Sequence, residues 1–101
     1  MKTVILAAAA MLVMTGCGSR VSGAIGEACI AADRKDASPT LCSCVQRAAN
    51  DTLSGGDQSK AAVFFGDPQA AHDTRISNSG SNERFWQRYK AFSERAEQMC
   101  R

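Results

Sequence analysis

Apolar residues recur at helical intervals near the end of the chain. Five of them follow one another at spacings of four, three, four and three residues: Phe85, Tyr89, Phe92, Ala96 and Met99. This spacing is that of one helix face. The pattern predicts that a C-terminal helix, beginning at about Asn82, is the longest element of the fold and packs its aromatic face across the others.

Weaker apolar patterns predict further helices upstream, over residues 24–34, 39–53, 55–65 and 68–75, while the Ser, Asn and Gly content of residues 76–82 indicates a loop. In the helix over 39–53, Leu41, Cys42 and Val45 are predicted to face inward. Four polar residues of the same helix are predicted to face water: Gln46, Arg47, Asn50 and Asp51. No segment alternates as a half-buried strand does. The predicted fold class is all-α, a small bundle of four to five short helices.

Three short motifs predict where helices begin. Ser38-Pro39 and Asp67-Pro68 each place a capping side chain before a proline, and proline suits the first helical position because that position leaves an N–H without a partner. Ser54, with Asp57 three residues later, matches a capping box. We therefore expect helices to start directly after Ser38, Ser54 and Asp67.

The beginning of the chain has the pattern of an export signal. Lys2 precedes an unbroken apolar run over residues 4–14, as in signal peptides, and this run is shorter than the roughly 20 residues of a membrane-spanning helix. The run leads into Val13-Met14-Thr15-Gly16-Cys17, which resembles the lipobox of bacterial lipoproteins. We expect residues 1–16 to be a lipoprotein signal peptide and Cys17 to carry lipid.

Residues 17–26 are predicted to be a flexible lipid-anchored tether, since three glycines and two serines fall within residues 18–26. Residues 27–101 then form one helical domain. Gly18, directly after the cysteine, is typical of sorting to the outer membrane, with the domain facing the periplasm. The mature chain, without Lys2, has eleven Lys and Arg against ten Asp and Glu. So small a net charge argues against a nucleic-acid-binding surface.

Four cysteines remain if Cys17 is lipidated, and they are predicted to form two disulfides: Cys29, Cys42, Cys44 and Cys100. Residues two apart on a helix point to different sides, so Cys42 and Cys44 are not expected to pair with each other. One pairs with Cys29 and the other with Cys100, and the sequence leaves both choices open. Disulfides suit an exported protein, and in so small a domain they provide a large share of the stability.

The cysteines also have two other readings, which we rank lower. The C-x-C spacing differs from that of familiar structural zinc sites, so neither a metal nor a cofactor is expected. A thiol redox role for Cys42 and Cys44 is an alternative, because Cys42 lies near a predicted helix N-terminus.

Few other residues are candidates for chemistry. His72 is the only histidine. A catalytic histidine needs a nucleophile and an orienting group beside it, and the sequence spacing identifies neither, so the chain is not expected to be an enzyme. Asp67, Asp73 and Tyr89 are the candidate ligands for a small cationic molecule, together with Trp86.

A partner contact is predicted at the edge of the C-terminal aromatic stripe. Trp86 lies there, where core packing is the favoured interpretation and a partner contact the alternative, because aromatic residues often anchor protein partners. Arg84 and Arg88 flank it in sequence. Interspersed glutamates on the same helix indicate a mixed, solvated face rather than a basic stripe.

A set of short motifs between Cys29 and Cys100 characterises the whole domain: Leu41-Cys42-Ser43-Cys44-Val45-Gln46, Thr52-Leu53-Ser54, Asp57-Gln58, Ala61-Ala62, Phe64-Phe65, Asp67-Pro68, Arg75, Phe85-Trp86, Arg88-Tyr89, Phe92 and Cys100. In these motifs the chain resembles a group of short exported alphaproteobacterial proteins often labelled arginine transporters. The resemblance carries over no catalytic or binding residue. Transport itself needs bilayer spans, which this chain lacks after the signal, so the resemblance implies at most an accessory or binding role in arginine transport.

These observations predict a non-enzymatic, membrane-tethered helical lipoprotein that acts as a binding or adaptor module for an envelope protein. A role as a binding or accessory protein for arginine transport is the first alternative. A thiol redox protein is the second.

Overall fold

The computed structural model describes residues 21–32, 34–35 and 37–100. Five helices lie within these ranges: α1 (Ala24–Ala31), α2 (Pro39–Thr52), α3 (Gly55–Gly66), α4 (Pro68–Arg75) and α5 (Gly80–Met99). The described part of the chain contains no strand, and the all-α fold class is confirmed. The predicted signal peptide and Cys17 lie outside the described residues.

The predicted capping residues begin their helices as expected. Ser38 Oγ accepts a hydrogen bond from the Leu41 N–H of α2 at 3.0 Å. Ser54 Oγ accepts from the backbone N–H of Asp57 in α3 at 3.2 Å. The corresponding bond at the start of α4 runs from an N–H of its first turn to the Asp67 carboxylate. Each cap satisfies a donor that the helix itself leaves free.

The ends of two helices differ from the sequence prediction. α5 begins at Gly80 rather than near Asn82, because Ser79 caps it through a bond from the Asn82 N–H at 3.4 Å. α1 ends at Ala31, before the charged stretch into which the prediction extended it. With 20 residues, α5 is the longest of the five helices, as predicted.

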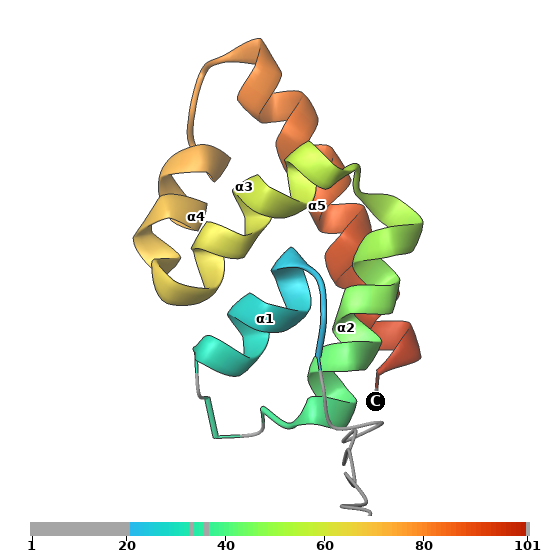
Figure 1. The fold of residues 1–101 in the computed structure, drawn as a ribbon. Helices are drawn as coiled ribbons and strands as arrows, with labels where there is room; N and C mark the ends of the chain where they lie inside the picture. The colour runs from blue at the N-terminus through green and yellow to red at the C-terminus, as the bar shows by residue number, and fades with distance from the viewer. Residues whose placement is uncertain (1–20, 33, 36, 101) are drawn as a thin grey trace, which may run out of the picture.

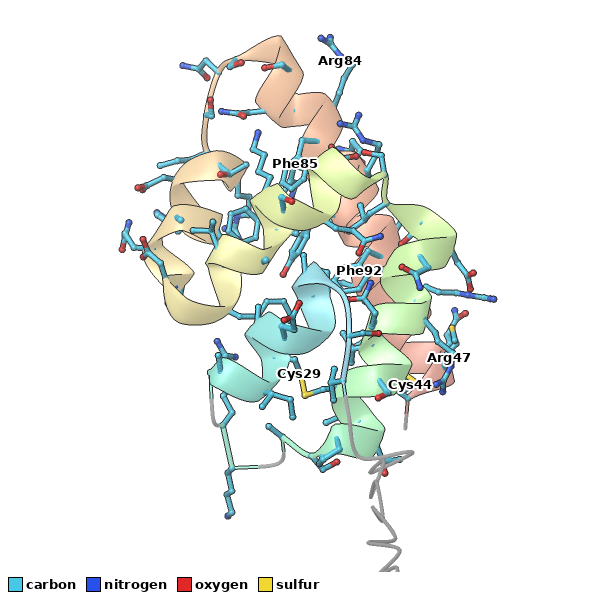
Figure 2. All side chains as sticks on the ribbon, in the orientation of Figure 1. Cys29, Cys44, Arg47, Arg84, Phe85 and Phe92 are labelled. Carbon is cyan, nitrogen blue, oxygen red and sulfur yellow. A yellow bond between two sulfur atoms is a disulfide. The ribbon has the colours of Figure 1, made fainter. Side chains whose placement is uncertain are left out.

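The helices pack around α2, which contacts both the first and the last helix. α5 crosses α2 and also contacts α4, while α1 packs against α2 and α3 (Figure 1). The buried core combines aliphatic and small residues from α1 to α3 with rings from α3 and α5: Ile25, Ala48, Ala49, Leu53, Ala61, Phe64, Phe85 and Phe92. Phe85 and Phe92 point inward between the helices (Figure 2), and the rest of the predicted stripe packs against them.

Gln46 was predicted to face water, and this prediction is wrong. Its side chain is only 8% exposed, and its Oε1 accepts a hydrogen bond from the Gly26 N–H in the first turn of α1 at 2.7 Å. Its amide nitrogen donates to Asn50 Oδ1 at 2.8 Å and to Gln58 Oε1 at 2.6 Å. Gln46 is buried because α1 covers this side of α2, and burial is tolerated because its polar atoms are bonded.

The predicted tether is too long at its C-terminal end. Gly23 is the N-cap of α1, with φ at +94°, and Gly26 is buried inside that helix. A Cβ on Gly23 would overlap the Gln46 side-chain amide, and a Cβ on Gly26 would overlap the Val21 side chain. Val21 and the residues after it therefore pack as part of the helical domain.

Candidate functional site

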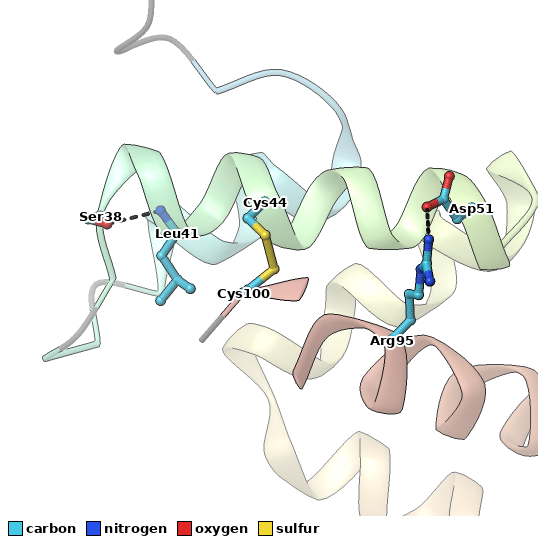
Figure 3. Close-up of a disulfide and its surroundings, with 6 residues drawn as sticks. All are labelled: Ser38, Leu41, Cys44, Asp51, Arg95 and Cys100. Atoms are coloured by element: carbon cyan, nitrogen blue, oxygen red, sulfur yellow. Dashed lines mark hydrogen bonds and ion pairs between the residues drawn. A yellow bond between two sulfur atoms is a disulfide. The ribbon is translucent and has the colours of Figure 1, made fainter. Parts of the chain in front are cut away.

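Two disulfides join α2 to the first and last helices. Cys29 of α1 pairs with Cys42, with the Cα atoms 5.6 Å apart. Cys44 pairs with Cys100, directly after α5, with the Cα atoms 5.7 Å apart. The prediction that Cys42 and Cys44 bond to different partners is confirmed. The choice left open is settled by the two bonds: Cys42 pairs toward α1, and Cys44 pairs with Cys100 at the end of α5 (Figure 3).

An apolar groove opens beside the Cys29–Cys42 disulfide, between α1, α2 and the end of α3. Its volume is about 370 Å³. Leu41 and Val45, one turn apart on α2, form one wall, and Phe65 near the end of α3 forms another. The described residues that line it are Cys29, Arg34, Lys35, Ala37, Leu41, Val45 and Phe65. We call this the α1–α2–α3 groove.

Basic side chains belong to the lining of this groove. Arg34 and Lys35 follow α1 and are exposed. The Arg34 guanidinium donates to the Phe65 carbonyl at 3.2 Å. A cation suits this position because the carbonyls at a helix C-terminus carry partial negative charge. The bond joins the segment after α1 to the end of α3 at one edge of the groove.

Two further hollows surround the first turn of α2. One, of about 270 Å³, is lined by Val21, Glu27, Ile30, Ala31 and Pro39. The other, of about 390 Å³, lies beside the second disulfide and is lined by Ser38, Thr40, Leu41, Cys44, Arg47, Met99 and Cys100. All three hollows therefore meet at the same end of the domain, around residues 37–41.

The predicted partner contacts do not form one free surface. Trp86 is half-buried in a ring cluster, with its centroid 6.4 Å from that of Phe64 and 5.2 Å from that of Tyr89. Arg88 makes a two-pronged ion pair with Asp57 of α3, with Nε–Oδ2 at 2.6 Å and Nη2–Oδ1 at 3.1 Å. Arg84 is exposed and points away from the bundle (Figure 2).

The Arg88 pair also acts on the carboxylate it binds. The hydrogen bond from Arg88 lowers the pKa of Asp57 from its ordinary value. Desolvation by burial partly offsets this effect. The bond joins the start of α3 to the middle of α5. Arg88 is therefore a structural partner of Asp57.

The candidate ligands for a small cation each have a structural contact, and two of them, Tyr89 and Trp86, share the ring cluster. Asp67 caps α4 through the Ala70 N–H, at 3.3 Å. The Asp73 carboxylate accepts a bond from the Gln69 amide at 2.9 Å. Tyr89 is in the ring cluster, where burial raises the pKa of its hydroxyl. Each of these groups has a structural contact of its own, and none of them lines the α1–α2–α3 groove.

The remaining candidates for chemistry are placed as follows. His72 is exposed on α4. Within residues 21–32, 34–35 and 37–100, no group of three or more His, Cys, Asp or Glu is arranged to hold a metal. The Cys42 side chain is fully buried in its disulfide. Over the same ranges, no helix is both long enough and apolar enough to span a bilayer.

Sequence reasoning identified Leu41 and Val45 as inward-facing and missed that they line a groove. It also missed Arg34, Lys35 and Phe65 as part of one site. Residues from three helices meet there, and only the packing of α1 against α2 and α3 brings them together. The stretch of mixed charge around Arg34 carries no signal of this in sequence.

Comparison of the chain with protein-family models, with curated proteins and with solved structures finds no match in any of the three.

Proposed function

We propose that this protein is an exported, lipid-anchored and non-enzymatic module that binds a protein partner in the cell envelope through the α1–α2–α3 groove. The observation that carries the proposal is the groove itself. Apolar walls from three helices are fixed by a disulfide on one side and by the Arg34–Phe65 bond on the other. A preformed apolar site of this kind binds with little ordering cost.

Export and anchoring are supported by the covalent bonds of the domain. Disulfides persist in oxidising compartments and are rare in the cytosol, and this small domain has two. The apolar run and the lipobox-like residues before Cys17 agree with an exported lipoprotein. The module would then face the periplasm from the outer membrane.

The chemistry of the groove favours an apolar side chain with an acidic neighbour as its occupant. At about 370 Å³, the groove is near the lower limit of small-molecule pockets, which run from about 300 to 1,000 Å³, but one or two side chains of a partner would fill it. The exposed Lys35 and Arg34 at its edge would attract a carboxylate.

The same charges make arginine a poor occupant, which ranks the transport-accessory alternative lower. A guanidinium would meet two like charges in the lining, and the candidate carboxylates Asp67 and Asp73 are occupied elsewhere. The thiol redox alternative ranks lower still, because Cys42 is fully buried and Cys44 is only 8% exposed, which hinders attack by an exchanging thiolate.

The first experiment tests the anchor. The intact mass of protein recovered from host membranes is measured after thiol alkylation without reduction. We expect a chain that starts at Cys17, gains a lipid-sized mass and carries no alkyl adduct. A lipid-free chain with alkylated cysteines would overturn the anchor and favour the redox alternative.

The second experiment tests the groove on cells. A photo-crosslinking phenylalanine analogue is placed at Leu41, and the matched control carries it at Val63, an apolar residue of α3 that is 53% exposed. We expect a defined crosslinked partner from Leu41 only, weakened by Lys35→Glu. Equal crosslinking at both positions, or a defined enzymatic turnover by the purified domain, would contradict the proposal.

A further inference from the structure

The hollow on the other side of α1 has no role in the proposed groove. Cys29 lines the groove, whereas Ile30 and Ala31 line this hollow together with Val21 and Pro39. Ile30 is 39% exposed, and Pro39 is also exposed. We call the residues Val21, Ile30, Ala31 and Pro39 the α1 outer face.

Val21 is fixed to this face. Its side chain lies against Gly26, leaving no space for a Cβ at that position. The buried Gln46 amide holds the Gly26 N–H from the other side. The chain is thus attached to the domain from Val21 onward.

The chain between this fixed point and the expected anchor is short. Val21 follows Cys17 by four residues, which span at most about 14 Å when fully extended. The polar headgroup layer on each side of a bilayer is itself about 5 to 8 Å thick. A lipid on Cys17 would therefore keep Val21, where the α1 outer face begins, within about 6 to 9 Å of the headgroup layer.

We propose that the α1 outer face is the surface by which the domain lies on the bilayer, with Ile30 entering the headgroup region. This inference rests on the proposed lipid on Cys17. A face of apolar residues next to an acyl anchor adds buried apolar area to the attachment and sets the orientation of the domain on the bilayer.

The charged residues near this face are of both signs. Arg34, Lys35 and Arg47 line the neighbouring hollows, and Glu27 lines the hollow of the face itself. Asp33 and Asp36 adjoin the two cations in sequence. Because acidic and basic residues are mixed here, attachment to the bilayer would depend on the apolar residues and the short chain to Cys17, not on net charge.

Another exposed apolar residue provides a matched control. Ile76 is 60% exposed, more than Ile30, and it follows α4. In Figure 1 the segment after α4 rises to the end of the molecule opposite the first turn of α2. Exposure alone would therefore favour lipid contact at Ile76, whereas the proposed orientation favours Ile30.

The test uses tryptophan fluorescence in the full lipidated chain. Ile30→Trp and Ile76→Trp are each made together with Trp86→Phe, and each protein is purified from membranes and checked by intact mass for lipid and two closed disulfides. Both are then reconstituted into phosphatidylethanolamine–phosphatidylglycerol vesicles with brominated acyl chains. We expect I30W to be blue-shifted and to lose most of its emission, and I76W to keep its emission.

The outcomes separate the two proposals. A chain without lipid overturns both the anchor and the membrane-facing surface. A lipidated chain with equal quenching at the two positions, or with stronger quenching of I76W, overturns the orientation and leaves the anchor intact. A lipidated I30W that is unquenched in vesicles, combined with a protein crosslink from position 30 in cells, would assign the face to a protein partner instead.

Discussion

The first and last helices are held in this fold by different means. α1 has eight residues and no side-chain N-cap. It is joined to α2 by a disulfide and by the hydrogen bond from Gly26 to Gln46. α5 has 20 residues and an apolar stripe whose rings pack on Phe64 in edge and tilted contacts.

Helix length explains the difference. Helices below about 12 to 15 residues are marginal on their own in water, and α1 has little apolar surface with which to compensate, burying Ile25 and Cys29 as its two larger side chains. α5 brings Phe85, Tyr89 and Phe92 to the core. A short helix is thus fixed by a covalent bond and a buried amide, whereas a long one is fixed by packing.

Removing either disulfide is expected to have the largest effect on stability, and the two removals should affect different regions. Cys44 and Cys100 are 56 residues apart, and Cys29 and Cys42 are 13 apart. Loop-closure entropy then predicts losses of about 4 kcal/mol for Cys44→Ser with Cys100→Ser, and about 3 kcal/mol for Cys29→Ser with Cys42→Ser. Urea denaturation measures both.

Hydrogen exchange sharpens this prediction, because it reports each region separately. Without Cys29–Cys42, we expect the amides of α1 to lose protection while those in the middle of α5 keep it. Without Cys44–Cys100, we expect the last turn of α5 to open and α1 to remain protected. If α1 kept its protection without its disulfide, packing alone would hold it, and the contrast between the two helices would fail.

Gln46→Leu is expected to have the next largest effect. Leucine is similar in size, but it leaves the buried Gly26 N–H without an acceptor and ends the bonds to Asn50 and Gln58. An unsatisfied buried donor costs about 1 to 3 kcal/mol. The control is Gln87→Leu, at an exposed position of α5, where a change within about 0.5 kcal/mol is expected. Equal losses in the two variants would show that the amide is not needed to hold α1.

The burial of Gln46 was within reach of sequence reasoning. Once Cys42 and Cys44 are assigned to different partner helices, α2 must be covered on two sides. Gln46 lies one turn after Cys42, and residues four apart share a helix face, so the helix bonded to Cys42 also covers Gln46. The prediction went wrong because it gave α2 a single buried face.

The groove and the disulfide pattern were not accessible in the same way. Capping signals such as Ser38-Pro39 and Asp67-Pro68 are local, and each predicted a helix start that the structure confirms. The two disulfide patterns differ only in which side of α2 each outer helix occupies, and no local signal encodes that. The groove depends further on α1 stopping at Ala31 and on α3 ending beside Arg34.

The smallest expected effect concerns the ion pair that joins α3 to α5, and it depends on pH. The hydrogen bond from Arg88 lowers the pKa of Asp57 below its ordinary value of 3.8. A carboxyl group with a lowered pKa in the folded state adds stability above the pKa of the unfolded chain, and this contribution is lost as the pH falls through the folded pKa. We therefore expect Asp57→Asn to be less stable than the parent at neutral pH and to lose less stability on acidification. The effect is small because the Arg88 side chain is 46% exposed and water screens such pairs.

Denaturation midpoints measured from neutral pH to about pH 3 follow this difference. Arg88→Gln should give the same flatter acid response, and the double variant should add nothing further. A parent and an Asp57→Asn variant with parallel pH profiles would mean that the pair does not contribute to holding α5 on α3, and that the rings of α5 suffice.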